Sequence, residues 1–305
     1  ADVVYEAEVE GMITRLMGIF EDYSGADRIG SVRSCRPYFI YYAREFNAFY
    51  CNYGQAIYAV PILQLSTTHN ISGISDGGVN DTGSIAYYRS DDRPSPHNVF
   101  TTYTMMQDAI SACGYSKDYS DSYTGHYRFA GDGEAVTLSN SIIARVVMPG
   151  YTFNHARFDY NEQDGLYYRS QYGSAQVDGQ TGSQVSYKNI ILQYCDSQPF
   201  DDNGYLWTDV TTSGVGKFIT NGKAIDITWK KAVSKEDSTF IVDIETPNVT
   251  VPLYTGDFTE TLYYDLDGNQ IKLNRGNTWI CLIRNSAADK VVITDDYTTP
   301  SDISD

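Results

Sequence analysis

Beyond about residue 127 the sequence consists of short apolar runs, each separated from the next by turn residues. Alternating runs of this length are typical of strands, whose successive side chains point to opposite faces. Asn221-Gly222 and Asp267-Gly268 stand between such runs, and both dipeptides favour β-hairpin turns. The runs are AVTLS, IIARVVM, ARFDY, LYYRSQ, NIILQYC, KFITNGKAIDITWKK, LYYDLDGNQIKL and TWICLI. We therefore predict a β-rich, mainly antiparallel C-terminal domain over residues 127–287.

The first part of the chain has a different pattern. Aromatic residues at helical spacing follow Pro37, which predicts a helix over residues 37–46. A second helix is predicted over 103–113, closed by Gly114. Residues 66–92 are rich in turn-forming residues and predict a long surface segment. The fold class is thus α+β, with an α/β N-terminal domain over 1–126, the β-rich domain, and a polar tail over 288–305.

The opening stretch VVYEAEVEGMITRLM places glutamates at alternate positions. Apolar residues alternate with Glu6, Glu8 and Glu10, which predicts a half-buried strand with the three carboxylates on one face. Glu6 and Glu10 would lie roughly 13 Å apart along such a strand, too far for a glycosidase acid–base pair. Three like charges in a row repel one another, so cations are expected opposite them, with Arg15, Arg33 and Arg36 as the nearest.

Composition limits the classes of function. The net charge of −17 argues against nucleic acid as a partner, because phosphate binding requires clustered cations. Anionic polymers are poor ligands for the same reason unless a local basic pocket overrides the overall field, whereas neutral glycans and cationic partners fit better. The five cysteines show no close pairing such as C-x-x-C, so neither a zinc site nor a disulfide framework is indicated. No metal or cofactor is predicted. No apolar run approaches the roughly 20 residues that span a bilayer.

Several blocks in the same order resemble the YerB-like family of bacterial extracytoplasmic lipoproteins, a family of unassigned function. These blocks are ADVVYEAEVEGMITR, IGSVRSCRPYF, PSPHN, FDYNEQDGLYYRSQ, KNIILQ, GKFITNGKAIDITWKK and DGNQIKLNRGNTWI. The chain departs from the family pattern at Cys35, where alanine is expected, and at Met12, where glycine is expected. Residues 234–259 form a longer connection than the family pattern implies, and we expect an added loop or hairpin there.

The resemblance implies a location and a place of attachment. It implies an extracytoplasmic protein at the surface of a Gram-positive-type bacterium, attached to the membrane by a lipid-anchored N-terminus. That anchor and an initial strand would precede the ADVVYE block and are missing from this sequence. The implied architecture, an α/β domain followed by a β-rich domain, agrees with the pattern of the residues.

Polar residues from separate matched blocks are the candidates for a site. Arginine is suited to bidentate pairing with carboxylate or phosphate, so a cleft lined by arginine and glutamate could bind an anion or a sugar. A structural ion-pair network is the alternative for the same residues. The binding candidates are Thr14, Arg15, Arg33, Ser34, Arg36 and Asn98, with Arg169 added from the hairpin block FDYNEQDGLYYRSQ.

His97 is the candidate for acid–base chemistry. It lies in the turn-forming context RPSPHN, and a loop histidine held by Glu6 or Glu10 could act as a general base. A histidine that only packs the loop is the alternative.

Two functions follow from these residues. The first is a non-enzymatic envelope protein that binds a cell-wall component or an envelope protein through its arginine- and glutamate-lined cleft. The second is a hydrolase or transferase that acts on cell-wall glycan or peptide, using His97 with Glu6 or Glu10. Convergence of Arg15, Arg33, Arg36 and His97 on one open pocket would favour a site over an ion-pair network.

Overall fold

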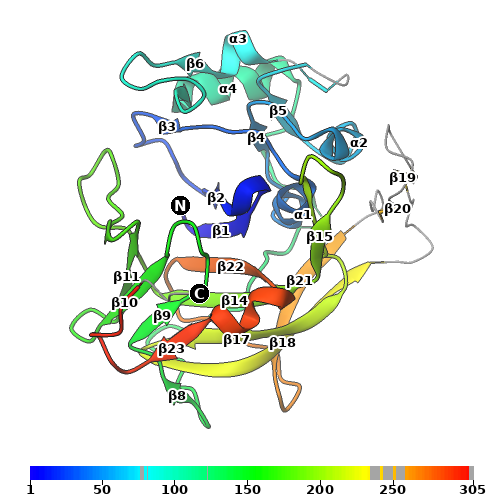
Figure 1. Ribbon diagram of the computed structural model, residues 1–305. Coiled ribbons are helices and arrows are strands. Elements are labelled where there is room, and N and C mark those ends of the chain that lie inside the picture. Colours follow the sequence, from blue (N-terminus) through cyan, green and yellow to red (C-terminus); the bar gives the residue numbers. More distant parts are fainter. Residues whose placement is uncertain are drawn as a thin grey trace. The chain divides into compact units, whose positions relative to one another are not determined.

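The structure, a computed structural model, describes residues 1–75, 79–80, 82–121, 123–233, 241–242, 250–251 and 258–301. The chain divides into two compact units. The sandwich unit contains 1–20, 127–231 and 261–305, and the α/β unit contains 21–126 and 232–260 (Figure 1). One break between the two units lies after residue 126. Residues 1–20, however, lie in the sandwich unit, because the first strand pairs with strands from the other end of the chain.

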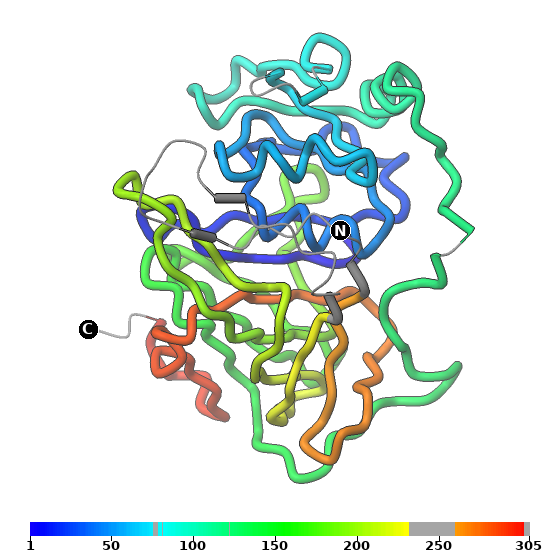
Figure 2. Tube along the Cα trace, turned by 90° about the vertical axis from the view of Figure 1, so that its right-hand side faces the viewer, coloured from blue at the N-terminus to red at the C-terminus, as the bar shows by residue number. Residues whose placement is uncertain are grey.

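The larger sheet of the sandwich unit has eight strands, in the order β2-β1-β22-β14-β17-β18-β21, with β8 paired to β18. Strand β22 is parallel to both of its neighbours, β1 and β14, whereas β14, β17 and β18 are antiparallel to one another. Figure 2 shows β17, β18 and β21 side by side in yellow and orange. The strands are β1 (Val3–Glu8), β2 (Thr14–Ile19), β8 (Ile142–Ile143), β14 (Asn189–Cys195), β17 (Ser213–Thr220), β18 (Lys223–Val233), β21 (Phe258–Asp265) and β22 (Thr278–Arg284).

The smaller sheet has six strands and is antiparallel throughout, in the order β12-β11-β10-β9-β23, with β13 paired to β11. Its strands are β9 (Val146–Met148), β10 (Arg157–Asn161), β11 (Leu166–Gln171), β12 (Ser174–Ala175), β13 (Ser186–Tyr187) and β23 (Val292–Thr294). A separate pair is formed by β15 (Ser197–Pro199) and β16 (Leu206–Thr208).

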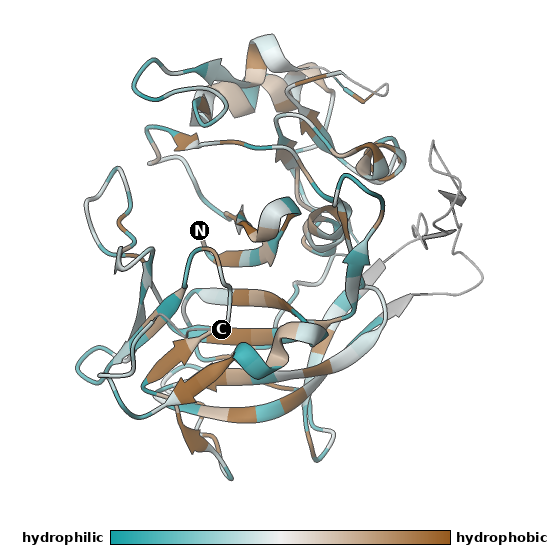
Figure 3. Cartoon of the chain, viewed as in Figure 1, coloured by the Kyte–Doolittle hydropathy of each residue, from teal (hydrophilic) through white to brown (hydrophobic). Residues whose placement is uncertain are grey.

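One hydrophobic core joins the two sheets of the sandwich unit. Ile190, Leu192 and Trp279 come from the larger sheet, and Val147 and Phe158 from the smaller one. Figure 3 shows hydrophobic colouring along the central strands of the larger sheet. All six residues of β1 are buried, whereas the sequence pattern predicted a half-buried strand.

The Asn221-Gly222 hairpin is confirmed. Thr220 pairs with Lys223, so the two residues form a two-residue turn between β17 and β18. Both have positive φ, 50° at Asn221 and 72° at Gly222, the backbone conformation that a type I′ turn requires. A Cβ atom on Gly222 would also lie 2.8 Å from Cε1 of Tyr160. The turn therefore explains why glycine stands at this position.

The α/β unit has four α-helices and three small sheets among the residues described, one of which is the β19-β20 pair described below. Strands β3, β7 and β6 form an antiparallel sheet in that order, and β4 and β5 form a parallel pair. The helices are α1 (Pro37–Glu45), α2 (Val60–Leu63), α3 (Gly83–Ala86) and α4 (Tyr103–Ala112). The strands are β3 (Ile29–Gly30), β4 (Tyr50–Asn52), β5 (Asn70–Ser72), β6 (Tyr88–Arg89) and β7 (Val99–Thr101).

Both predicted helices are confirmed, as α1 and α4. Pro37 is in the first turn of α1, and Thr102 caps α4 by accepting a hydrogen bond from the Met105 amide. The predicted surface segment 66–92 is wrong in part, since it contains β5, α3 and β6. Ile71 and Tyr87 from this segment are buried in the core of the unit, together with Val99 and Met106. These contacts could not be read from a turn-rich composition.

Three further predictions concern the run AVTLS, the polar tail and the added segment 234–259. The run AVTLS is not a strand. The polar tail begins later than predicted, because β23 pairs with β9 and adds residues 292–294 to the smaller sheet. In the segment 234–259, β19 (Ile241–Val242) pairs antiparallel with β20 (Thr250–Val251), as expected for an added hairpin. The rest of the segment before Phe258 lies outside the described residues.

Candidate functional site

Glu6 lies at a buried polar centre between the two sheets of the sandwich unit. The side chains of Glu6, on β1, and Arg169, on β11, are both 0% exposed and form an ion pair of 2.7 Å. Oε1 of Glu6 also accepts hydrogen bonds of 2.9 Å from the Thr14 hydroxyl and the Asn154 amide. Oε2 accepts a 3.0 Å bond from the Trp279 indole. Four donors thus surround this carboxylate, and none of its surface is exposed.

Arg169 is held on several sides. Its guanidinium lies 4.5 Å from the ring centre of Trp279, and it donates to Gln171 and Gln176. The buried charge of Arg169 is thus paired, hydrogen-bonded and stacked, which offsets much of its desolvation, although its Nε–H has no hydrogen-bond partner among the described residues. This arrangement favours a structural role for Glu6, Thr14 and Arg169, because no ligand or substrate reaches a fully enclosed carboxylate.

The other acidic candidates have separate surroundings. Glu8 pairs with Arg284 at 2.6 Å, so both strand glutamates have their cations on β11 and β22. The sequence predicted Arg15, Arg33 and Arg36 as the nearest cations to this strand. The cations that pair with Glu6 and Glu8 are instead Arg169 and Arg284, which are distant in sequence. Glu10 is partly buried in a 3₁₀ turn, Glu10–Met12, and is therefore not on the strand face. Arg15 is partly buried on β2, where it pairs in register with Ala7.

The remaining candidates lie in the α/β unit, around the sheet β3-β7-β6. We define the arginine cluster as Arg33 and Arg89 together with His97 and Asn98. Arg28 and Arg93 lie over the Phe100 ring on β7, at 4.5 and 5.1 Å from its centre. Asp92 pairs with Arg28 at 2.8 Å and lies 3.7 Å from Arg93. Hydrogen bonds from the Ser90 hydroxyl and from Arg28 lower the pKa of Asp92, so it is an anion at neutral pH.

Arg33 is held by His97. Nη1 of Arg33 lies 2.6 Å from Nδ1 of His97. Arginine has no acceptor, so it must be the donor, and Nδ1 must be the unprotonated nitrogen of the ring. The proton of a neutral ring is then on Nε2, which makes His97 a hydrogen-bond donor toward its surroundings. In this arrangement neither ring nitrogen is free to accept a proton from a substrate.

Arg89 is held by the next residue, Asn98. Nη1 of Arg89 donates to Oδ1 of Asn98 at 2.8 Å, and Nδ2 of Asn98 donates to the carbonyl of Ser90 at 3.1 Å. The guanidinium also lies 5.1 Å from the ring centre of Tyr53. The amide of Tyr53 donates to the carbonyl of Arg33, which ties this ring to the Arg33 segment. Asn98 therefore orients Arg89, a role that sequence analysis did not give it.

Arg33 and Arg89 have no carboxylate partner among the residues that the structure describes. Their charges are therefore available to a ligand. Arg36, in contrast, is buried beside α1 and donates to the carbonyl of Cys35 at 2.7 Å. Ser34 donates to the carbonyl of Tyr53 at 3.3 Å. The structure thus brings Arg33, His97, Ser34 and Asn98 into one neighbourhood and gives Arg36 a place in the core.

Sequence analysis missed Arg89 as a member of the cluster, and it missed Arg28 and Arg93 around the same sheet. The signal that points to them is arginine density, since they lie in DRIGSVRS and YYRSDDRPSPHN, on both sides of the predicted candidates. Within the described part of the chain no group of three or more His, Cys, Asp and Glu residues could hold a metal ion.

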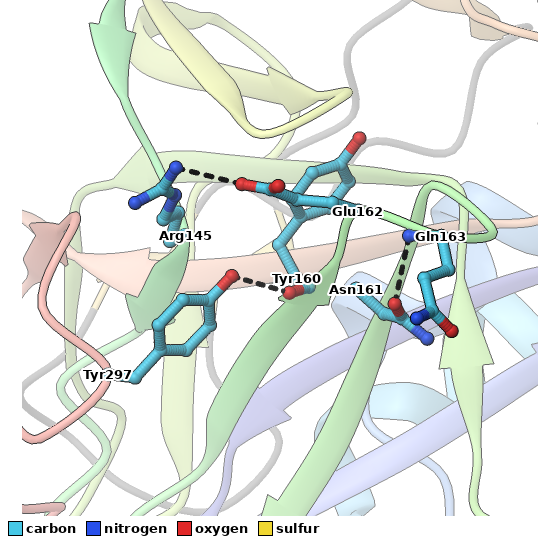
Figure 4. Close-up of a pocket in the computed structure, with 6 residues that line it drawn as sticks. All are labelled: Arg145, Tyr160, Asn161, Glu162, Gln163 and Tyr297. Atoms are coloured by element: carbon cyan, nitrogen blue, oxygen red, sulfur yellow. Dashed lines mark hydrogen bonds and ion pairs between the residues drawn. The ribbon is translucent and has the colours of Figure 1, made fainter.

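An open depression lies elsewhere, in the sandwich unit. It is lined by Arg145, Tyr160, Asn161, Glu162, Gln163 and Tyr297 (Figure 4). None of these residues was a candidate from the sequence, because the depression forms only where the β10–β11 turn meets the chain after β23.

These features define a class: an α+β protein whose sandwich unit is held by buried ion pairs and whose α/β unit carries an exposed arginine cluster. No helix in the described residues is both long enough and apolar enough to cross a membrane. Residues 1–116 match the N-terminal domain of the family described as "Protein of unknown function (DUF3048)", and residues 144–257 match its C-terminal domain. The chain belongs to this family.

A curated relative and a solved structure agree with this assignment. The chain is 28% identical over 234 residues to "Putative lipoprotein YerB" of Bacillus subtilis (strain 168), covering 76% of this chain and 67% of the relative. The crystal structure of the YerB protein from Bacillus subtilis has the same fold, with a TM-score of 0.74 at 23% identity, covering 96% of this chain and 86% of that one. The resemblance to the YerB-like family and the α+β fold class are both confirmed.

Proposed function

We propose that this protein is a binding protein of the bacterial cell envelope, and that its arginine cluster binds an anionic group of an envelope component or of a protein partner. The observation that carries the proposal is the pair Arg33 and Arg89, whose guanidinium groups are positioned by His97 and Asn98 and have no carboxylate partner in the described residues. Unneutralised arginines held by neutral side chains are suited to carboxylate or phosphate.

The chemistry of the cluster supports an anion. The guanidinium groups and the Nε2 proton of His97 offer hydrogen-bond donors, and the acceptor of the Asn98 amide is already used by Arg89. The overall charge of −17 repels anions at long range. At about 0.1 M salt, however, charges more than roughly 10 Å apart are largely screened, so a local cluster can override the overall field.

Binding is better supported than catalysis. Glu6, one of the two carboxylates considered as a partner of His97, is fully enclosed and paired with Arg169. His97 accepts from Arg33 at the nitrogen that a base would use. A general base needs an unoccupied acceptor within reach of the proton that it removes.

The name of the Bacillus subtilis relative supports the location. That protein bears the name "Putative lipoprotein YerB". By family membership we infer an extracytoplasmic protein that is attached to the membrane through a lipid. The partners that fit are a cell-wall component or another envelope protein, in either case through a carboxylate or phosphate group.

The test is calorimetric titration of the protein with tripolyphosphate and, separately, with citrate. The two probes distinguish phosphate from carboxylate as the preferred group. We expect saturable binding, and we expect Arg33→Gln and Arg89→Gln each to weaken it roughly tenfold through the loss of charge-assisted hydrogen bonds.

Lys223→Gln is the matched control. Lys223 is exposed, has no carboxylate partner in the described residues, and lies in the sandwich unit, so the variant loses the same charge away from the cluster. Its affinity should stay within about twofold of the wild type. Equal weakening by all three variants would mean that only the overall field matters, and absence of binding to both probes would refute the proposal.

A further inference from the structure

The open depression of the sandwich unit has an aromatic wall in a fixed position. The Tyr297 side chain is part of this wall, and its residue is 45% exposed. Its hydroxyl donates to the carbonyl of Tyr160 at 2.8 Å, which fixes the ring from one side (Figure 4). From the other side, the guanidinium of Arg157 donates to the carbonyls of Tyr297 and Thr299. An exposed ring that is already ordered loses little entropy when it contacts a ligand.

The backbone around the depression is equally well ordered. The Tyr160 amide donates to the carbonyl of Arg145 at 2.8 Å, and the Arg145 amide donates to the carbonyl of Thr294 at 3.0 Å. At the β10–β11 turn, Oδ1 of Asn161 accepts a 3.0 Å bond from the Gln163 amide. The lining residues are therefore placed by hydrogen bonds of the sandwich unit itself.

The charges of the depression balance. Arg145 and Glu162 form a 2.8 Å ion pair, and their side chains are 40% and 62% exposed. One oxygen of Glu162 and the remaining guanidinium N–H groups are left for a ligand. The side-chain amide of Gln163 makes no hydrogen bond among the described residues and adds a donor and an acceptor. A balanced pair discriminates against strongly charged ligands and presents both donors and acceptors.

We propose that this depression binds a ring of a neutral saccharide. A sugar ring has an apolar C–H face that packs on an aromatic ring, and hydroxyl groups that both donate and accept hydrogen bonds. The apolar C–H face is matched by the rings of Tyr160 and Tyr297. The hydroxyl groups are matched by the Arg145–Glu162 pair and the Gln163 amide. The volume of about 540 Å³ lies within the range of roughly 300–1,000 Å³ that is usual for small-molecule sites. This site is independent of the arginine cluster.

The test uses neutral tetrasaccharides as probes. We would titrate the protein with chitotetraose and with cellotetraose, which differ in their acetamido groups, and with the anionic tetragalacturonate. We expect saturable binding of at least one neutral probe, with a dissociation constant of about 1 mM or below. Tyr297→Ala should weaken it roughly three- to tenfold through loss of the ring, and Tyr297→Phe should retain most of the affinity.

Further variants separate this site from general surface effects. Tyr172→Ala is the matched control, because Tyr172 is 58% exposed in the same unit, between β11 and β12, and does not line the depression. Gln163→Ala changes an exposed side chain that makes no hydrogen bond in the described residues, so it tests the site with little risk to folding. Glu162→Gln leaves Arg145 without its counterion and should shift preference toward tetragalacturonate.

Several outcomes would overturn the proposal. These are an absence of saturable binding by both neutral probes, binding by tetragalacturonate alone, and neutral binding that is unaffected by both Tyr297→Ala and Gln163→Ala. We expect Arg33→Gln and Arg89→Gln to bind the saccharides as the wild type does. The two proposals therefore stand or fall separately: a refuted saccharide site leaves the anion-binding proposal for the arginine cluster unaffected, and a refuted anion site leaves the saccharide proposal unaffected.

Discussion

Replacing Glu6 by glutamine removes the only negative charge that pairs with Arg169 among the residues that the structure describes. The variant keeps the size of the side chain but leaves a fully buried guanidinium without its counterion. Its new NH₂ group replaces one oxygen and accepts no hydrogen bond, so either the Trp279 indole at Oε2 or all three donors at Oε1 lose their acceptor. Breaking a buried ion pair by removing one partner costs about 3–5 kcal/mol.

This loss is large compared with the total stability of a domain, about 5–15 kcal/mol. The assay is urea unfolding followed by tryptophan fluorescence. All three tryptophans, Trp207, Trp229 and Trp279, lie in the sandwich unit, so fluorescence reports the unfolding of that unit. We expect the free energy of unfolding of Glu6→Gln to be about 4 kcal/mol below that of the wild type.

Glu162→Gln is the control for this prediction. It removes the acid of an Arg–Glu pair of similar length in the same unit, but that pair is exposed to solvent. Exposed pairs contribute about 0–1 kcal/mol, so this variant should be close to the wild type. In the double variant Glu6→Gln with Arg169→Met, part of the loss should be recovered, because no unpaired cation remains. A loss below about 1 kcal/mol in Glu6→Gln, or additive effects in the double variant, would refute the reasoning.

Three further predictions concern stability. Thr102→Ala removes the cap of α4 and should cost about 1 kcal/mol, measured as faster amide hydrogen exchange along that helix. Gly222→Ala forces alanine to a φ of 72° and against Tyr160, and should lower the unfolding free energy of the sandwich unit by at least ~1 kcal/mol in urea titrations. Burial raises the pKa of the Cys195 and Cys281 thiols above the ordinary value of 9.0. Above about pH 9 these thiols ionise in the unfolded chain but stay protonated in the folded protein, so the stability that they contribute is present below that pH and lost above it. The urea midpoint should therefore fall as the pH rises above about 9. An unchanged midpoint would contradict this prediction.

The sequence by itself determined the local structure well. Pro37 and Gly114 mark the ends of helices through their own backbone preferences, and Asn221-Gly222 specifies its hairpin in the same way. The alternation of Val3, Tyr5 and Ala7 with glutamates predicted β1 as a strand. These signals act over a few residues, so they can be read without knowing what packs against them.

The candidate site depended on contacts across the whole chain. Glu6 was identified as a charge that needs a cation, yet its partner, Arg169, is 163 residues away, and neither spacing nor propensity encodes that pairing. The arginine cluster was found in part, because Arg33, His97 and Asn98 lie in recognisable blocks. Arg89 became a member only because β6 pairs with β7, which places it beside Asn98.

The division of the chain into units was also decided by tertiary structure. Residues 1–20 precede the α/β unit in sequence, but β1 pairs with β22 near the other end of the chain and so belongs to the sandwich unit. Local pattern establishes that a segment is a strand, whereas its neighbours in a sheet are chosen by how its two faces are buried. For this protein, short-range preferences therefore gave the elements and the fold class, and long-range burial decided which charges are enclosed and which remain available for a ligand.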